Sequence, residues 1–371
     1  MKSLRLTASV VCAALGALNA ITIQAQSAAS NLSQYPQAIS ADYTVHNFHF
    51  DAGGELPDLR MHYVTLGEPR RNAAGHVDNA VILLHATIST SSEFLDSTFA
   101  GVLFGPGQLL DAHKYYILLP DSIGAGGSSK PSDGLHARFP AFSYQDMVRA
   151  QHMLFTEALH IDHARLILGT SMGGMHTFLW GVTYPQFSDA LMPIACLPVE
   201  VAGRNRVTRQ MIVDAIRNDP SYDGGEYKTE PLYGLRIADE IATIMVSSPL
   251  QMQTKGPTAA QTDQEFTETI NHDLEHLDAN NFLYLFGASK GYNPYPKLGS
   301  IQVPLTLVNS ADDFIDPPEL GIAGKAIQLI PSGQYVLLPI TDQTRGHRTF
   351  GMPTIWQPYL KQLLERSEPK P

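Results

Sequence analysis

The stretch Leu168-Gly169-Thr170-Ser171-Met172-Gly173-Gly174-Met175 decides the fold of this chain, because it places a serine between an apolar run and a helical pattern. Residues 165–168 resemble a buried strand, and residues 176–180 have the spacing of a helix. A serine on a sharp strand-to-helix turn needs small residues two positions before and two after it, where a side chain would meet backbone. Gly169 and Gly173 meet this need. The pentapeptide G-x-S-x-G is weak by itself, but in this context it predicts a nucleophile elbow with Ser171 at its tip.

Apolar runs recur on both sides of the elbow and alternate with helical patterns. Such runs suit strands that are buried on both faces of a sheet. We expect a β-hairpin within residues 43–66, strands at 80–84, 115–120, 165–168, 190–196, 303–308 and 334–338, and helices at 143–159, after the elbow, and at 355–364. This alternation predicts an α/β fold with a mostly parallel central sheet and helices on both faces.

The strand signal disappears between Pro198 and Lys297, where helical patterns cover 207–216, 237–246 and 264–277. An insertion of this kind is expected to form a helical cap, or lid, over the carboxyl ends of the strands, where α/β proteins bind ligands. The predicted core therefore comprises residues 28–198 and 298–371, and the predicted cap comprises residues 199–297.

The first residues have the pattern of a secretory signal peptide. Lys2 and Arg5 precede the uncharged stretch 6–23, and Ala25-Gln26-Ser27 places small residues where a signal peptidase cleaves. We expect cleavage near residue 27 and a periplasmic or secreted protein. An N-terminal membrane anchor is the alternative, but the apolar stretch is short for a membrane span.

Composition and charge argue against nucleic-acid binding and against a functional cysteine. The 371-residue chain is 44% hydrophobic, as is usual for a globular protein. Loss of residues 1–27, which hold Lys2, Arg5 and no acidic residue, changes the formal net charge from −11 to −13. Such a surface repels phosphate backbones, so nucleic acid is an unsuitable partner. Cys196 is the only cysteine after the leader, and its apolar neighbours predict a buried, unreactive thiol without a disulfide.

Acyl transfer by Ser171 requires a histidine to take its proton and a carboxylate to orient that histidine. In chains with this elbow the order is serine, acid, histidine. Asp312 and Asp313 follow the strand at 303–308, and either could be the acid. Of 14 histidines, His347 is the one that lies in a loop directly after the last strand and follows a glycine. We prefer Asp313 as the acid and His347 as the base.

The oxyanion that forms when Ser171 attacks a carbonyl needs two preorganised donors. The backbone N–H of Met172 provides one by its position at the start of the elbow helix. The second is expected in the loop after the strand at 80–84, and the best candidate is the N–H of Thr87.

Two other motifs have simpler explanations. His272 and His276 are spaced to share a helix face, but their order differs from H-E-x-x-H, so we expect a solvated face and no metal. The glycine-rich stretch 124–129 lacks the G-x-x-x-x-G-K-[ST] pattern of a phosphate cradle and is expected to be a surface loop.

The chain resembles the homoserine O-acetyltransferase family of α/β-hydrolases from about Phe48 to Leu364. The matching stretches are 78–81 with His85-Ala86-Thr87, Gly105-Pro106-Gly107 with Leu110-Asp111, Phe139-Pro140 with 146–151, and Gly173-Gly174-Met175, together with 215–216, 219–220, 224–227 and 234–235 in the cap. The resemblance implies an α/β-hydrolase fold. It also matches the family's acid motif to Asp313 with Pro317-Pro318 and its Gly-His motif to Gly346-His347, which favours Asp313 over Asp312.

Several residues differ from the family pattern, and the differences bear on which molecule accepts the acyl group. Where the family's transferases have H-A-L-T-G, this chain has His85-Ala86-Thr87-Ile88-Ser89, and His347 is followed by Arg348 instead of an acidic residue. Stretch 197–204 also differs from the family. An exported enzyme would meet little acetyl-CoA, whereas water is abundant and can resolve the same acyl-enzyme.

We therefore expect an exported serine carboxylesterase that acts on a small-molecule ester through Ser171, His347 and Asp313, without a cofactor. The alternative is an O-acyltransferase, such as a homoserine O-acetyltransferase that uses acetyl-CoA. A non-catalytic binding protein on the same fold is a third hypothesis, which the complete set of catalytic positions disfavours. The sequence leaves a homodimer open.

Overall fold

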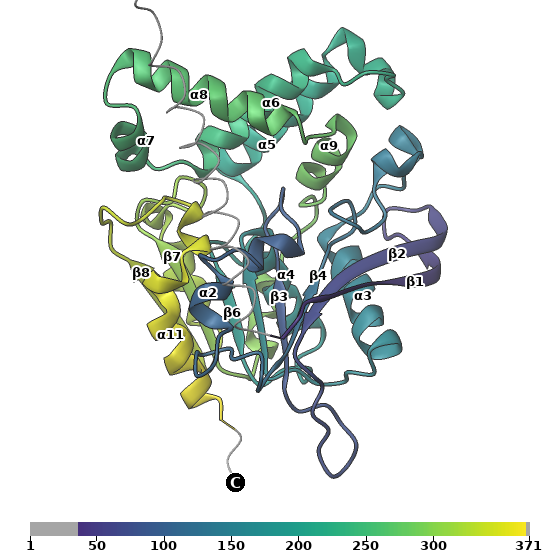
Figure 1. The fold of residues 1–371 in the computed structure, drawn as a ribbon, viewed down its shortest axis with the longest axis vertical. Coiled ribbons are helices and arrows are strands. Elements are labelled where there is room, and N and C mark those ends of the chain that lie inside the picture. The colour runs from purple at the N-terminus through teal and green to yellow at the C-terminus, as the bar shows by residue number, and fades with distance from the viewer. Residues whose placement is uncertain (1–35, 369–371) are drawn as a thin grey trace, which may run out of the picture.

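A computed structural model describes residues 36–368, so the predicted signal peptide lies outside the described residues. The chain forms one eight-stranded sheet in the order β1-β2-β4-β3-β5-β6-β7-β8 (Figure 1). The strands are β1 (Ile39–His49), β2 (Glu55–Leu66), β3 (Ala80–Leu84), β4 (Tyr116–Pro120), β5 (Leu166–Thr170), β6 (Leu191–Ile194), β7 (Leu305–Ser310) and β8 (Gly333–Leu338). The hairpin β1–β2 is antiparallel and joins β4 antiparallel, whereas the strands from β4 to β8 are parallel.

The predicted α/β fold with a mostly parallel sheet is confirmed, and strand boundaries differ by a few residues. β6 ends at Ile194 because Ala195 has a positive φ of 54°, which stops the extended conformation. β7 begins at Leu305, after Pro304, which has no N–H for the ladder, and it continues to Ser310.

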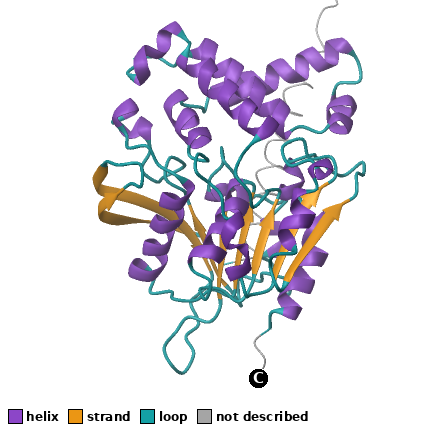
Figure 2. Ribbon diagram, turned by 180° about the vertical axis from the view of Figure 1, so that it is seen from behind, coloured by secondary structure: helices purple, strands orange, loops and turns teal. Residues whose placement is uncertain are grey.

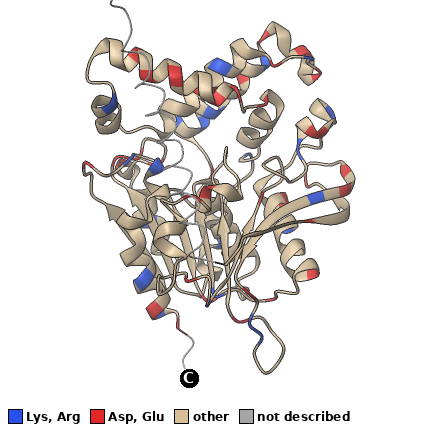
Figure 3. Cartoon of the chain, viewed as in Figure 1, with Lys and Arg blue, Asp and Glu red and all other residues tan. Residues whose placement is uncertain are grey.

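The central strands are buried on both faces, as their continuous apolar runs predict. In β3, Ile82 and Leu84 join one apolar cluster, while Val81 and Leu83 join another on the opposite face. Strands β3 to β7 contain no Asp, Glu, Lys or Arg, and the charged residues gather on the helices and the surface (Figure 3). Burial of apolar surface on two faces is therefore what stabilises this sheet.

Helices α3 (Tyr144–Met153) and α4 (Met172–Thr183) cover one face, and α2 (Ala100–Leu103) and α11 (Pro353–Arg366) cover the other. Ser143 caps α3 in a capping box with Asp146, and the helix continues as a π-helical turn (Leu154–Ala158), so the helix expected over 143–159 is present with one irregular turn. Helix α10 (Ile322–Ile327) lies between β7 and β8.

The segment between β6 and β7 is helical, with α5 (Gly203–Arg217), α6 (Leu232–Val246), α7 (Pro249–Lys255), α8 (Ala259–Leu274) and α9 (Ala279–Gly287). These helices form a layer beyond one end of the sheet (Figures 1 and 2). They have an apolar cluster of their own, which includes Ile212, Leu235 and Phe282. Between residues 36 and 368, no helix is both long and apolar enough to cross a membrane.

Candidate active site

The elbow places Ser171 at the junction of β5 and α4 in a strained conformation. Its φ of 51° and ψ of −110° are unusual for a residue with a side chain. A Cβ atom on Gly169 would lie 2.0 Å from the carbonyl oxygen of Gly173, and one on Gly173 would lie 1.9 Å from the carbonyl oxygen of Leu84. Both glycines are therefore required by close backbone approaches, as the sequence predicts.

A continuous chain of hydrogen bonds links the three residues expected to react. The Oγ atom of Ser171 lies 2.8 Å from Nε2 of His347, and Nδ1 of His347 donates to Oδ2 of Asp313 over 2.8 Å. That bond fixes the histidine tautomer in which Nε2 is free to accept a proton from Ser171. All three side chains are buried. The structure thus brings Ser171, His347 and Asp313 together in the arrangement of an acyl-transfer triad.

Asp312, the competing acid, faces the loop that carries the histidine. Its Oδ2 atom accepts hydrogen bonds from the backbone N–H of Gly346 (3.1 Å) and from Oγ1 of Thr344 (2.9 Å). Burial acts against ionisation, but these bonds and one from Ser310 hold the pKa of Asp312 below its ordinary value. Asp312 therefore positions the loop, and Asp313 contacts the imidazole.

Electrostatics around His347 favour its protonated form despite burial. Burial acts to lower the pKa of His347, but the Asp313 carboxylate and the nearby Asp316 carboxylate raise it above the ordinary value. A cation that develops on the imidazole during reaction is therefore stabilised by two buried carboxyl groups.

The two expected oxyanion donors are the residue that follows Ser171 and a residue in the wall of the same cavity. Met172 is the first residue of α4, so its N–H lies at the helix N-terminus, and Thr87 follows β3 in a wall of the same cavity as Ser171. In the described part of the chain, neither amide donates to another protein group. Both N–H groups are therefore free to bind an oxyanion.

Two residues that the sequence analysis did not single out as functional hold the Thr87 loop in place. His85 donates from Nδ1 to the carbonyl oxygen of Ala86 (2.7 Å) and accepts at Nε2 from the N–H of Ser122 (2.9 Å). Glu93 accepts from the N–H of Ala86 (3.2 Å) and from Oγ1 of Thr170 (2.5 Å), which adjoins Ser171. No local motif identifies Glu93, because its role depends on contacts with distant parts of the chain.

A cavity of about 610 Å³ lies over the triad, between the strand-end loops and the helices of the 203–287 segment. Its walls include Ser171 and His347 from the core together with Asp239 of α6 and His272 of α8. Arg209 of α5, which is buried and bonded to Asn205, also contributes. Substrate bound at Ser171 would therefore contact both layers of the protein.

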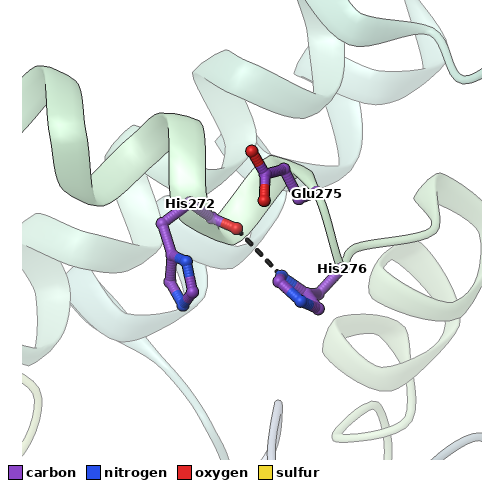
Figure 4. A group of neighbouring side chains, drawn as sticks. All are labelled: His272, Glu275 and His276. Carbon is purple, nitrogen blue, oxygen red and sulfur yellow. Dashed lines mark hydrogen bonds between the residues drawn. The ribbon is translucent and has the colours of Figure 1, made fainter. Parts of the chain in front are cut away.

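His272, Glu275 and His276 form an exposed group at the carboxyl end of α8, with ligand atoms within 4.8 Å of one another (Figure 4). Nδ1 of His276 donates to the carbonyl oxygen of His272 over 3.0 Å. His272 lies in the last turn of α8, and Glu275 and His276 follow its end directly, which accounts for their proximity. Cys196 is buried, and burial raises the pKa of its thiol well above the ordinary value, so it is not a thiolate nucleophile.

Comparison with known families agrees with this geometry. Residues 79–340 match the family described as alpha/beta hydrolase fold. The chain belongs to this family. Within it, this α/β-hydrolase is similar to the homoserine O-acetyltransferase of Moorella thermoacetica, with 30% identity over 362 residues that cover 85% of this chain and 94% of the relative. It is also similar to a probable acyltransferase of Methanothermobacter thermautotrophicus, at 27% identity over 84% of this chain and 93% of the relative. The predicted resemblance to the homoserine O-acetyltransferase family is confirmed.

Solved structures of two kinds share the fold of this α/β-hydrolase. A homoserine O-acetyltransferase from Bacillus anthracis has a TM-score of 0.76 at 19% identity and covers 90% of this chain and 98% of its own. The acetyl esterase MekB has a TM-score of 0.76 at 22% identity and covers 88% of this chain and 97% of its own. At these identities the likeness concerns the fold, which both enzyme types use.

Proposed function

We propose that this protein catalyses acyl transfer through an acyl-enzyme at Ser171. The observation that carries the proposal is the pair of 2.8 Å contacts that join Ser171 to His347 and His347 to Asp313. Nε2 of His347 takes the Ser171 proton as Oγ bonds to the acyl carbon, and the N–H groups of Thr87 and Met172 bind the oxyanion. His347 then returns the proton to the leaving group as its bond to the acyl carbon breaks. An acceptor hydroxyl regenerates Ser171 by the reverse sequence.

For the acceptor, the relatives support an alcohol better than water. The curated relatives that it matches over most of their length include several homoserine O-acetyltransferases and a probable acyltransferase, so O-acetyl transfer from acetyl-CoA to an alcohol is the first candidate. Hydrolysis of small esters, the reaction that the sequence analysis ranks first, is the second candidate. The presence of Arg348 after His347 and the changed residues at 87–89 favour it, because these positions border the cavity.

The test is a product analysis with purified protein. Acetyl-CoA and homoserine would be supplied together, and O-acetylhomoserine, acetate and free CoA would be measured over time. Formation of O-acetylhomoserine faster than acetate supports the transferase, whereas acetate release that is independent of homoserine supports the hydrolase. Ser171→Ala should abolish either reaction, and Ser300→Ala, at an exposed serine outside the cavity, should leave it unchanged.

We also propose that residues 1–27 direct export and that residues 199–297 act as a lid over the cavity. The leader's composition supports the first part, and the contribution of α5, α6 and α8 to the cavity wall supports the second. Expression of the full chain in a bacterium, followed by fractionation and N-terminal sequencing, tests export. A mature N-terminus near residue 28 in the periplasmic or secreted fraction is the expected result.

A further inference from the structure

The carboxyl end of α8 places two imidazoles and a carboxylate side by side. One ligand atom from each of His272, Glu275 and His276 lies within 4.8 Å of the other two (Figure 4). Nitrogen and oxygen atoms that share a tetrahedral metal ion lie about 3.4 Å apart, because each is about 2.0–2.1 Å from the ion. All three side chains are exposed, so rotation about their own bonds can close the remaining gap. The group therefore has the residue types and the spacing of a three-ligand metal site.

The hydrogen bonding of His276 prepares its ring for a metal ion. Nδ1 of His276 donates to the carbonyl oxygen of His272 over 3.0 Å, as Figure 4 shows. In the neutral imidazole this bond places the proton on Nδ1, so Nε2 has a free lone pair. A metal-bound histidine ordinarily makes a bond of this kind with its other nitrogen, because the bond orients the ring. Within residues 36–368, neither histidine nor Glu275 forms an ion pair that would compete with a metal ion.

The charged groups around this end of α8 favour a bound cation. Burial, and after it the Asp273 carboxylate, raise the pKa of Asp239 on the facing helix α6 to about 7. Glu240 adds to this effect, whereas Arg348 and Arg236 act against it. The repulsion among the carboxylates thus exceeds the attraction of the two guanidinium groups. A divalent cation beside them would reduce that repulsion.

Both histidines of the group belong to the catalytic cavity. His272 and His276 line the cavity of about 610 Å³ that also contains Ser171 and His347. An ion bound to the two imidazoles would therefore lie on the lid side of this cavity. Three protein ligands leave at least one coordination position of such an ion for water or for an oxygen of a bound molecule. The hydrated ion would take up space that a substrate needs to reach Ser171.

We propose that His272, Glu275 and His276 bind a divalent transition-metal ion of the zinc type in the lid-side wall of the catalytic cavity, and that this ion restricts access to Ser171. Imidazole nitrogen with carboxylate oxygen suits Zn²⁺, whereas Mg²⁺ and Ca²⁺ prefer oxygen ligands. The glutamate of H-E-x-x-H is a general base, but Glu275 is a ligand here, so the different residue order does not prevent binding. The restriction of access rests on the proposed acyl transfer at Ser171, whereas the metal site itself does not.

Calorimetric titration with ZnCl₂ tests the site in purified protein that has no histidine tag, at about pH 7.5, where imidazole is ordinarily neutral. We expect His272→Ala and His276→Ala each to weaken Zn²⁺ binding at least about tenfold, since loss of even an outer partner of a ligand has an effect of this size. Glu275→Gln, which keeps the shape and removes the charge, should also weaken it. The controls His49→Ala and Glu268→Gln, at exposed positions of β1 and α8, should leave the affinity unchanged. An excess of CaCl₂ should not displace the zinc ion.

Turnover of a short p-nitrophenyl ester provides the second readout. Zn²⁺ should lower kcat/KM of the wild type, with a midpoint at the Kd from calorimetry, and the double variant His272→Ala/His276→Ala should escape this inhibition. Asp313, Asp316 and His347 are another group of possible ligands, and they include two residues of the triad. Inhibition that persists in the double variant would place the ion at that group and overturn our assignment.

The metal site and the proposed function can fail separately. Equal Zn²⁺ affinities of the wild type and the double variant would overturn the site, whether or not Ser171 is reactive. Binding that requires both histidines but leaves turnover unchanged would support the ion and overturn its effect on access. Binding that requires both histidines in a protein that neither hydrolyses nor transfers an acyl group would support the site and overturn the proposed function.

Discussion

The carbonyl oxygen of Leu84, at the end of β3, lies 1.9 Å from the position that a Cβ atom on Gly173 would occupy. β3 and β5 are adjacent parallel strands, so α4 begins directly against the end of β3. The N–H of Gly173 donates to the carbonyl oxygen of His85 over 3.0 Å. The elbow and the loop that carries Thr87 are therefore held together through Gly173.

Gly173→Ala should disrupt this contact and reduce activity by about 100-fold or more, because a shift of about 1 Å in a catalytic group has effects of this size. The added methyl group meets backbone that cannot rotate away. Gly324→Ala in α10 is the matched control, since nothing lies within 4 Å of its Cβ position. Ester turnover and thermal unfolding of both variants provide the measurement. Normal turnover by Gly173→Ala would contradict the close approach.

Asp313→Asn and Asp312→Asn should differ in kind. Asp313→Asn leaves His347 without the acceptor that fixes its tautomer, and the same change in a well-studied serine protease triad lowers kcat about 10⁴-fold. Asp312→Asn replaces an acceptor of the Gly346 N–H and should lower the unfolding temperature with a smaller effect on kcat. Steady-state kinetics and thermal unfolding separate the two, and equal losses of kcat would contradict our assignment.

Activity should fall as the pH is lowered through the pKa of His347, because the base must be neutral. That pKa is raised by Asp313 and Asp316 despite burial, so the loss should begin above the value of about 6.5 for an unperturbed histidine. One carboxylate oxygen of Asp313, one of Asp316 and one ring nitrogen of His347 lie within 4.8 Å of one another. These three side chains therefore titrate together, and the apparent pKa belongs to all of them. A profile of kcat/KM from about pH 5 to 9 measures it. Asp316→Asn should move the midpoint to lower pH, and an unmoved midpoint would contradict this prediction.

Local patterns were sufficient to predict the sheet and the triad. Gly169 and Gly173 flank Ser171, and Gly346 precedes His347, so the glycines that the close backbone approaches require lie within two residues of the reacting groups and are readable in sequence. The buried runs of β3 and β5 follow from burial on both faces.

The supporting residues and the buried carboxylate of the cavity wall could not be found in this way. Glu93 acts through contacts with Ala86 and Thr170, and Asp316 acts through its proximity to Asp313 and His347. Asp239 lies in an ordinary amphipathic helix, and only the packing of α6 over the core shows that its carboxylate is buried. These roles are set by tertiary packing, which has no short sequence signature.

Asp239 should also make the stability of the fold depend on pH. Its pKa is raised to about 7 in the folded protein, above the ordinary value, so the folded state retains a proton that the unfolded state has lost. The stability from this proton is fully present below the unfolded pKa and is lost as the pH rises through about 7. Between pH 5 and 8 the free energy of unfolding of the wild type should therefore fall relative to that of Asp239→Asn by on the order of 2 kcal/mol.

Urea unfolding of both proteins at the two pH values measures the difference. Asp316 and Glu230, whose pKa values are also raised to about 7, contribute equally to both proteins and cancel in the comparison. Parallel pH profiles for the two proteins would show that Asp239 is ionised at little cost in the folded state, and would contradict this prediction.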